Sequence, residues 1–188
     1  MNLLKAFIAL TVSCTLLIQV TFLKAADNIL TYKDQTLQLT ATFANNFAKS
    51  HQLNHYHTGS CTPGMAHSCC SFGLMGNQQM NLSELKILTH ECVKTYIAFI
   101  SAQPATNQFY FQKKEWQKSL PLGFQPDYVG IRIGFWTKDM NRQMPPYIAE
   151  MRFFNKTYHY YQADPETQKL ILVNEEPYDE QIQKTEPK

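Results

Sequence analysis

Residues 128–137 have the sequence YVGIRIGFWT, and this stretch decides the fold class. Its apolar residues alternate with glycine, arginine and tryptophan: Val129, Ile131, Ile133 and Phe135 against Gly130, Arg132, Gly134 and Trp136. This period of two is typical of a strand with one buried face. Upstream of Pro126, apolar residues recur every three or four positions instead, which is typical of helices. The chain therefore changes from helix to strand near Pro126.

Two amphipathic helices are predicted upstream. The first covers Asp27 to about Ser50, and the second covers Leu82 to about Gln103, with Ser83 as a candidate N-cap. The second has an apolar stripe made of Leu85, Leu88, Cys92, Tyr96 and Phe99. A shorter amphipathic segment covers Phe109 to Leu120.

Three more strands are predicted downstream: Tyr147–Phe153, Thr157–Gln162 and Leu170–Val173. Asn155 and Lys156 form a tight turn between the first two, and the last strand, apolar on both faces, is expected to be central. The order predicts an α+β fold, with N-terminal helices followed by an antiparallel sheet of about four strands. Cystatin-like, NTF2-like and Cache-like cone-shaped folds share this order, as architectural analogies only.

The N-terminus has the pattern of a secretory signal. A short basic start with Lys5 precedes an apolar run over residues 6–23 and small residues at Ala25 and Ala26. We expect residues 1–25 to be a signal peptide or, alternatively, an uncleaved anchor. Residues 26–174 then form a single domain, and residues 175–188 form a mobile acidic tail. The protein is expected to be secreted or periplasmic.

The charge balance argues against polyanionic partners. Without Lys5 and Lys24 of the first 25 residues, the 17 basic residues fall to 15, equal to the 15 acidic ones. A chain of zero net charge is a poor candidate for binding nucleic acid or anionic lipid. We therefore expect a protein partner or a small-molecule ligand, and contact with a membrane only through an uncleaved anchor.

Residues 51–79 show neither helical nor strand periodicity and are predicted to form a Cys/His-rich loop. With Cys14 in the signal, four cysteines remain, Cys61, Cys69, Cys70 and Cys92. An even number in an exported chain predicts two disulfides. Adjacent Cys69 and Cys70 pair poorly, which leaves Cys61–Cys69 with Cys70–Cys92, or Cys61–Cys70 with Cys69–Cys92.

The same loop supports an alternative interpretation as a metal site. His51, His55, His57 and His67, together with the thiols, suit zinc, copper or haem. Because the spacings match no established motif and exported cysteines are more often oxidised, the favoured prediction has no cofactor.

The predicted sheet supplies the candidate binding surface. Its residues are Tyr128, Arg132, Trp136, Arg152 and His159. Arginine beside aromatic rings is the composition enriched at interaction surfaces, although an ordinary ion pair between Glu150 and Arg152 with covered aromatics is the simpler alternative. We predict an exported, non-enzymatic binding or assembly domain. The alternatives are a metal- or haem-binding protein and a small secreted hydrolase.

Overall fold

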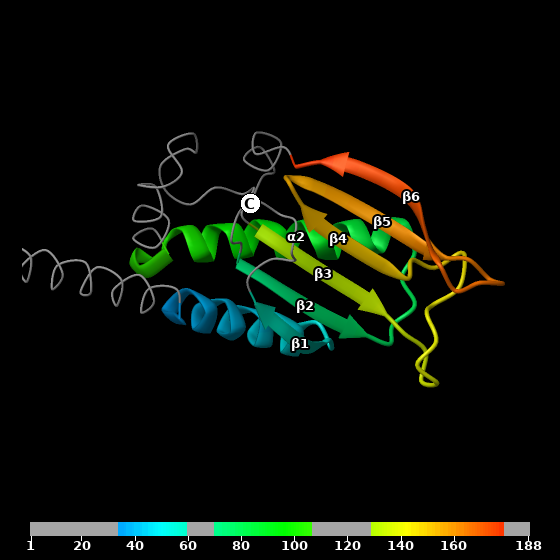
Figure 1. Ribbon diagram of the computed structural model, residues 1–188, viewed down its shortest axis with the longest axis horizontal. Helices are drawn as coiled ribbons and strands as arrows, with labels where there is room; N and C mark the ends of the chain where they lie inside the picture. Colours follow the sequence, from blue (N-terminus) through cyan, green and yellow to red (C-terminus); the bar gives the residue numbers. More distant parts are fainter. Residues whose placement is uncertain (1–33, 60–69, 107–128, 179–188) are drawn as a thin grey trace, which may run out of the picture.

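The computed structural model describes residues 34–59, 70–106 and 129–178 of the chain. Residues 34–50 belong to a first helix, here called the N-terminal helix. The other elements are β1 (Asn54–Gly59), β2 (Cys70–Gly76), α2 (Leu82–Ser101), β3 (Val129–Phe135), β4 (Glu150–Phe154), β5 (Thr157–Ala163) and β6 (Leu170–Pro177) (Figure 1). The predicted α+β class is confirmed.

The six strands form one sheet in the order β1-β2-β3-β4-β5-β6. Every neighbouring pair is antiparallel except β2 and β3, which are parallel. A parallel pair requires a crossover connection, and α2 lies in the stretch between these two strands. The sheet is therefore mixed and six-stranded, instead of antiparallel with about four strands.

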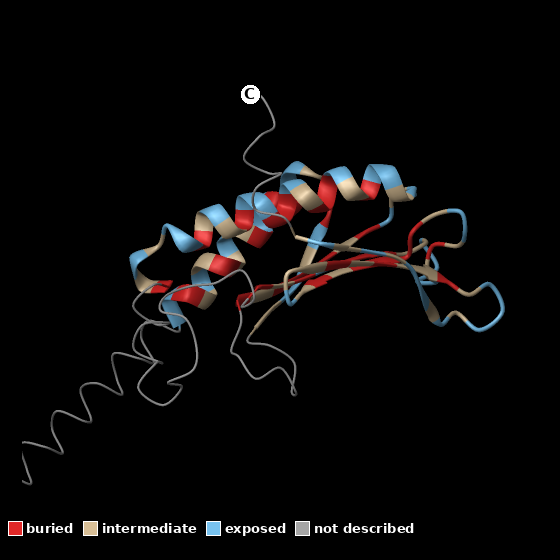
Figure 2. Ribbon diagram, turned by 90° about the horizontal axis from the view of Figure 1, so that it is seen from above, coloured by how far each residue is buried: buried red, intermediate tan, exposed pale blue. Residues whose placement is uncertain are grey.

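The helices cover one face of this sheet, as Figure 2 shows. We call this the core face and the opposite side the outer face. The alternation in residues 129–135 is confirmed, since Val129, Ile131, Ile133 and Phe135 are all at most 2% exposed on the core face. On the helices, Phe43 of the N-terminal helix and Tyr96 of α2 meet Phe72 of β2 at ring-centroid distances of 4.9 to 5.9 Å.

The predicted loop over residues 51–79 contains two strands. β1 is a polar edge strand whose pairing with β2 shifts between His55 and His57, so its side chains do not follow a strict alternation. β2 does alternate, but its outer-face positions are Ser71, Gly73 and Met75, two small residues and one apolar residue, so no polar row alternates with its core-face residues. For these reasons the sequence pattern of residues 51–79 did not predict either strand.

The C-terminal strands match the prediction in part. The two-residue turn at Asn155 and Lys156 is confirmed, with positive φ angles of 49° and 55° joining β4 to β5. The strand beginning at Leu170, expected to be central, is instead the sheet edge β6. Its apolar side chains are exposed, Ile171 at 48% and Leu172 at 46%. β6 also includes Glu175 and Glu176, which were predicted to begin a mobile tail.

The N-cap of α2 is Asn81, one residue before the helix begins, and not Ser83 as predicted. The Asn81 side chain accepts a hydrogen bond from the backbone N–H of Glu84, and the Glu84 carboxylate accepts one from the Asn81 N–H. This reciprocal capping box satisfies two backbone donors at the helix start. Ser83 lies inside the first turn instead.

Several predicted features lie outside the described residues: the signal segment, the start of the first helix at Asp27, Cys61, Cys69, His67, the segment Phe109–Leu120 and Tyr128. In the three described ranges, we find no helix with the length and apolar character needed to cross a membrane.

Candidate functional site

The chain contains three arginines, and all three contact one buried carboxylate. Glu150 has no exposed side-chain surface, and its two oxygens accept hydrogen bonds from Arg132 Nη2 at 2.6 Å, Arg142 Nη1 at 3.2 Å and Arg152 Nε at 2.5 Å. We call these four residues the arginine cluster. Three positive charges around one negative charge leave a formal surplus of two.

Strand register brings the cluster together on the outer face. Arg132 of β3 lies directly opposite Arg152 of β4, and Gly134 lies opposite Glu150 two pairs further along. Arg142 reaches the same place from the connection between β3 and β4, because it forms an isolated β-bridge with Trp136. Like charges directly across a strand pair repel each other, so Glu150 offsets a repulsion that the register imposes.

Aromatic rings hold two of the guanidinium groups. Arg142 lies 4.9 Å from the centre of the Trp136 ring, and Arg152 lies 4.9 Å from the centre of the Tyr161 ring. Such cation–π contacts restrict the guanidinium planes and leave their edges available for hydrogen bonds. The cluster is thus preorganised by neighbouring side chains.

The guanidinium groups remain charged and accessible. Burial lowers the pKa of Arg132, but the hydrogen bond and the charge of Glu150 outweigh burial and raise that pKa overall. The side chains of Arg132 and Arg152 are 44% and 41% exposed, whereas Glu150 is fully buried. Because each arginine has five N–H donors and uses one on Glu150, most donors face away from the carboxylate. This arrangement suits recognition of an anion by charge-assisted hydrogen bonds.

The structure places most of the predicted binding residues on this face. Arg132, Trp136 and Arg152 belong to the cluster or contact it. His159 of β5 lies opposite Arg152, stacks on Phe154 with ring centroids 4.2 Å apart, and has its Nε2 atom 3.7 Å from Glu175. The remaining predicted residue, Tyr128, lies outside the described ranges.

Three residues of the site were not predicted. Arg142 lies in a connection without periodicity, and Glu150 was interpreted only as an ordinary surface partner of Arg152. Tyr56 lies in the stretch predicted as a loop, yet its hydroxyl end lies over Gly73, which pairs directly with Arg132, so Tyr56 lies beside the cluster. The sequence feature that could have indicated this site is that all arginines of the chain lie within residues 132–152.

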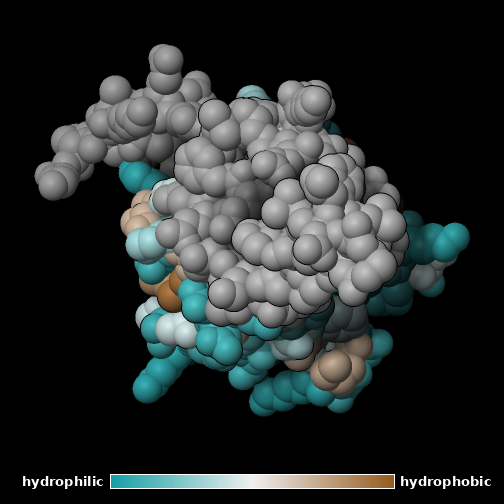
Figure 3. All heavy atoms as spheres, turned by 60° about the vertical axis from the view of Figure 1, so that its left-hand side comes forward, coloured by the Kyte–Doolittle hydropathy of each residue, from teal (hydrophilic) through white to brown (hydrophobic). Residues whose placement is uncertain are grey.

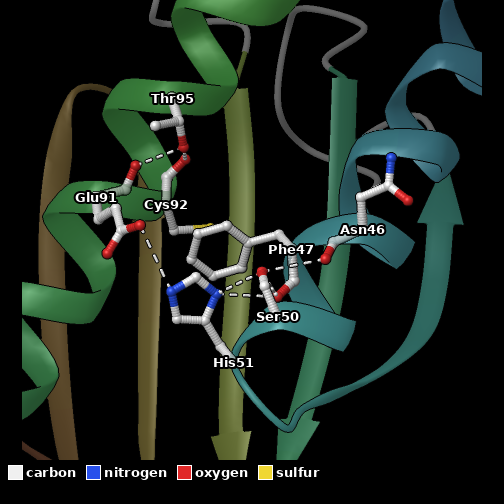
Figure 4. Close-up of polar contacts among 7 residues, drawn as sticks. All are labelled: Asn46, Phe47, Ser50, His51, Glu91, Cys92 and Thr95. Carbon is white, nitrogen blue, oxygen red and sulfur yellow. Dashed lines mark hydrogen bonds and ion pairs between the residues drawn. The ribbon is translucent and has the colours of Figure 1, made fainter.

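The histidines proposed as metal ligands have separate roles. His51 stacks on Phe47 with ring centroids 4.0 Å apart, its Nδ1 atom lies 3.0 Å from the Phe47 carbonyl, and its Nε2 atom lies 3.5 Å from Glu91 of α2 (Figure 4). His55 instead contacts Asn45 and Thr58. Within the described ranges, no group of three or more potential metal-binding side chains comes together. With His67 outside those ranges, the metal hypothesis stays a prediction.

The two described cysteines are both buried, and no disulfide joins them. Cys70 is 2% exposed on β2, and Cys92 is 0% exposed on α2. The pairing Cys70–Cys92 is therefore not present in this structure. Burial, followed by the neighbouring charge of Glu91, raises the pKa of the Cys92 thiol well above its usual value, which makes it a poor nucleophile. Cys61 and Cys69 lie outside the described residues, so the other pairings stay predictions.

The described surface that is visible in Figure 3 is mostly hydrophilic, with small groups of hydrophobic residues. Comparisons with protein-family models, curated proteins and solved structures found no match to this chain. The cystatin, NTF2 and Cache analogies therefore stay untested, and the chemistry of the arginine cluster is what supports a function.

Proposed function

We propose that this protein is an exported, non-enzymatic binding domain that holds an anionic group of a small ligand or protein partner on its outer sheet face. The observation that supports this most strongly is the convergence of all three arginines on buried Glu150, with a surplus of two positive charges. A purely structural ion pair needs one cation for one carboxylate. The additional arginines place charge repulsion on the sheet, which an anionic ligand would relieve.

Two further observations support the same proposal. Arg132 and Arg152 combine a fixed contact on Glu150 with more than 40% side-chain exposure, so they present donors to solvent from a rigid base. The aromatic supports under Arg142 and Arg152 reduce the entropy that binding would cost. Export is part of the proposal, and its support is the signal pattern of residues 1–25.

A thermal-shift titration tests the proposed site. Inorganic phosphate is added at constant ionic strength to the wild type, to the double variant Arg132→Gln/Arg152→Gln and to Lys138→Gln, which removes an exposed positive charge outside the cluster. A ligand that binds only the folded state raises the melting temperature as its concentration exceeds Kd. We expect saturable stabilisation of the wild type and Lys138→Gln, and none of the double variant. Equal stabilisation of all three proteins, or of none, would overturn the proposal.

A further inference from the structure

An exposed aromatic ring lies beside the arginine cluster. Tyr56 is the extra residue where the register between β1 and β2 shifts, a β-bulge of the kind that redirects a side chain. Its ring crosses β2 at Gly73, where an added Cβ atom would lie 2.4 Å from Tyr56 Cζ. Only glycine at position 73 therefore leaves room for the hydroxyl end of the ring over β2, and Gly73 pairs directly with Arg132 of the cluster. Tyr56 nevertheless remains 49% exposed.

The charge pattern limits the size of the acidic group that fits this face. Across the sheet, Arg132, Arg152 and His159 occupy directly opposite positions on β3, β4 and β5. The next residue in this row is Glu175 of β6, an exposed carboxylate. Because neighbouring strands are about 4.8 Å apart, the stretch of this row from Arg132 to His159 is on the order of 10 Å wide. A long polyanion crossing the strands would meet Glu175, whereas a compact dianion would not.

We infer that the ligand is a small organic acid that places a dianionic group on Arg132 and Arg152 and stacks a planar body on Tyr56. This inference rests on the proposed function and adds the chemical class of ligand. The dianion matches the surplus of two charges in the arginine cluster. The planar body matches the exposed ring whose hydroxyl end lies over Gly73. A phosphate monoester and a dicarboxylate both have this chemistry.

Calorimetric titration of the whole mature chain with four probes tests the inference. Phenyl phosphate and phthalate each combine a dianion with a ring, inorganic phosphate lacks the ring, and benzoate has a ring with a single charge. We expect the better of the two ring dianions to bind about fivefold more tightly than inorganic phosphate, through stacking, and roughly tenfold more tightly than benzoate, through charge. Tighter binding of phenyl phosphate would identify the acidic group as a phosphate monoester, and tighter binding of phthalate would identify it as a dicarboxylate.

Variants of Tyr56 and Gly73 separate the contribution of stacking to binding from that of charge. Tyr56→Leu removes the planar ring, and Gly73→Ala displaces it with a Cβ atom. Both are expected to lose the preference for ring dianions while binding inorganic phosphate within about twofold of the wild type. Tyr56→Phe retains the ring and is expected to retain the preference.

The outcomes distinguish the two proposals. If the wild type binds inorganic phosphate as tightly as the ring dianions, or if Tyr56→Leu keeps the preference, this inference is overturned while the proposed function stands. If the wild type binds none of the probes, both are overturned.

Discussion

At the scale of single residues, Glu150 organises the outer face. It is fully buried, yet its partners are three arginines that reach solvent to different extents. Two of these arginines, Arg132 and Arg152, are directly opposite each other on neighbouring strands. Without the carboxylate, their charges would repel across the strand pair with nothing to offset them. We therefore expect Glu150 to stabilise the fold of the site as well as set its charge pattern.

Replacement of Glu150 by glutamine tests this role. We expect Glu150→Gln to lower the free energy of unfolding by about 2–3 kcal/mol, less than the loss typical of a fully buried ion pair because the arginines are partly exposed. Urea denaturation monitored by circular dichroism measures the change. Glu166→Gln, in the exposed turn after β5, is the matched control and should change stability by less than about 0.5 kcal/mol. Equal stability of the two variants would contradict this account of the cluster.

The sequence predicts part of this site, for identifiable reasons. A period of two places Arg132 and Trp136 on one face without knowledge of the fold. The period of two contains no information on which strand pairs with which. The convergence of the arginines on Glu150 depends on the register of β3 and β4, so the sequence pattern could not predict it. Arg142 and Tyr56 come from a connection and from a bulged strand, where side-chain direction does not follow from local pattern.

At the scale of elements, the N-cap of α2 provides a direct comparison of sequence and structure. Asn81→Ala removes a side chain that accepts a hydrogen bond from Glu84 N–H, and we expect a loss of about 1 kcal/mol in unfolding free energy. Ser83→Ala, at the position predicted from the sequence, should be nearly neutral because the helix has already begun there. Chemical denaturation of both variants distinguishes the two caps. A larger loss for Ser83→Ala would place the helix start where the sequence pattern does.

A second element-scale prediction concerns the attachment of β6 to α2. The Glu176 carboxylate accepts hydrogen bonds from Lys86 Nζ at 2.6 Å and from the Tyr160 hydroxyl at 3.1 Å, and it lies 2.6 Å from His90 Nε2. Burial alone would raise the pKa of Glu176, but these partners outweigh burial and lower it. The ionised carboxylate therefore stabilises the fold above its unfolded pKa of about 4.3, and this contribution is lost as pH falls through the folded value.

Acid titration of stability measures this contribution. Between pH 5 and pH 3 the wild type is expected to lose more stability than Glu176→Gln, which has no carboxylate to protonate at this position. Glu175→Gln, the neighbouring residue with a 55% exposed side chain, should follow the wild-type slope. Parallel curves for the wild type and Glu176→Gln would show that Glu176 has no role in attaching β6.

Long, periodic elements were predictable and short or irregular ones were not. The α2 helix and the β3 strand have unambiguous hydrophobic periods, and both are present as predicted. β1 is polar because it is an edge strand, and β6 is apolar although it is one as well. Position in a sheet depends on long-range pairing, so hydrophobicity alone missed β1 and placed β6, which it did predict as a strand, at the centre of the sheet.

At the scale of the whole molecule, buried hydroxyls join the N-terminal helix to α2. Thr40 is 0% exposed, donates a hydrogen bond to the Thr36 carbonyl at 2.8 Å and lies 2.9 Å from the Tyr96 hydroxyl. We expect Thr40→Val to lower the free energy of unfolding by about 1–2 kcal/mol because it removes a hydrogen-bonding partner from a buried hydroxyl. Thr42→Val, on the exposed side of the same helix, should change stability by less than about 0.5 kcal/mol. Urea denaturation that gave equal values for both variants would contradict this description of the helix pair.

The whole-molecule arrangement places the helices on one face of the sheet and the arginine cluster on the other. The most direct test of binding at that cluster is an NMR titration of the isotope-labelled wild type with phenyl phosphate. We predict saturable shifts of backbone amides centred on β3 and β4 around Arg132 and Arg152, with smaller shifts near Gly73. Saturable shifts centred on α2, or no saturable shifts at all, would contradict the assignment of the outer face as the binding site.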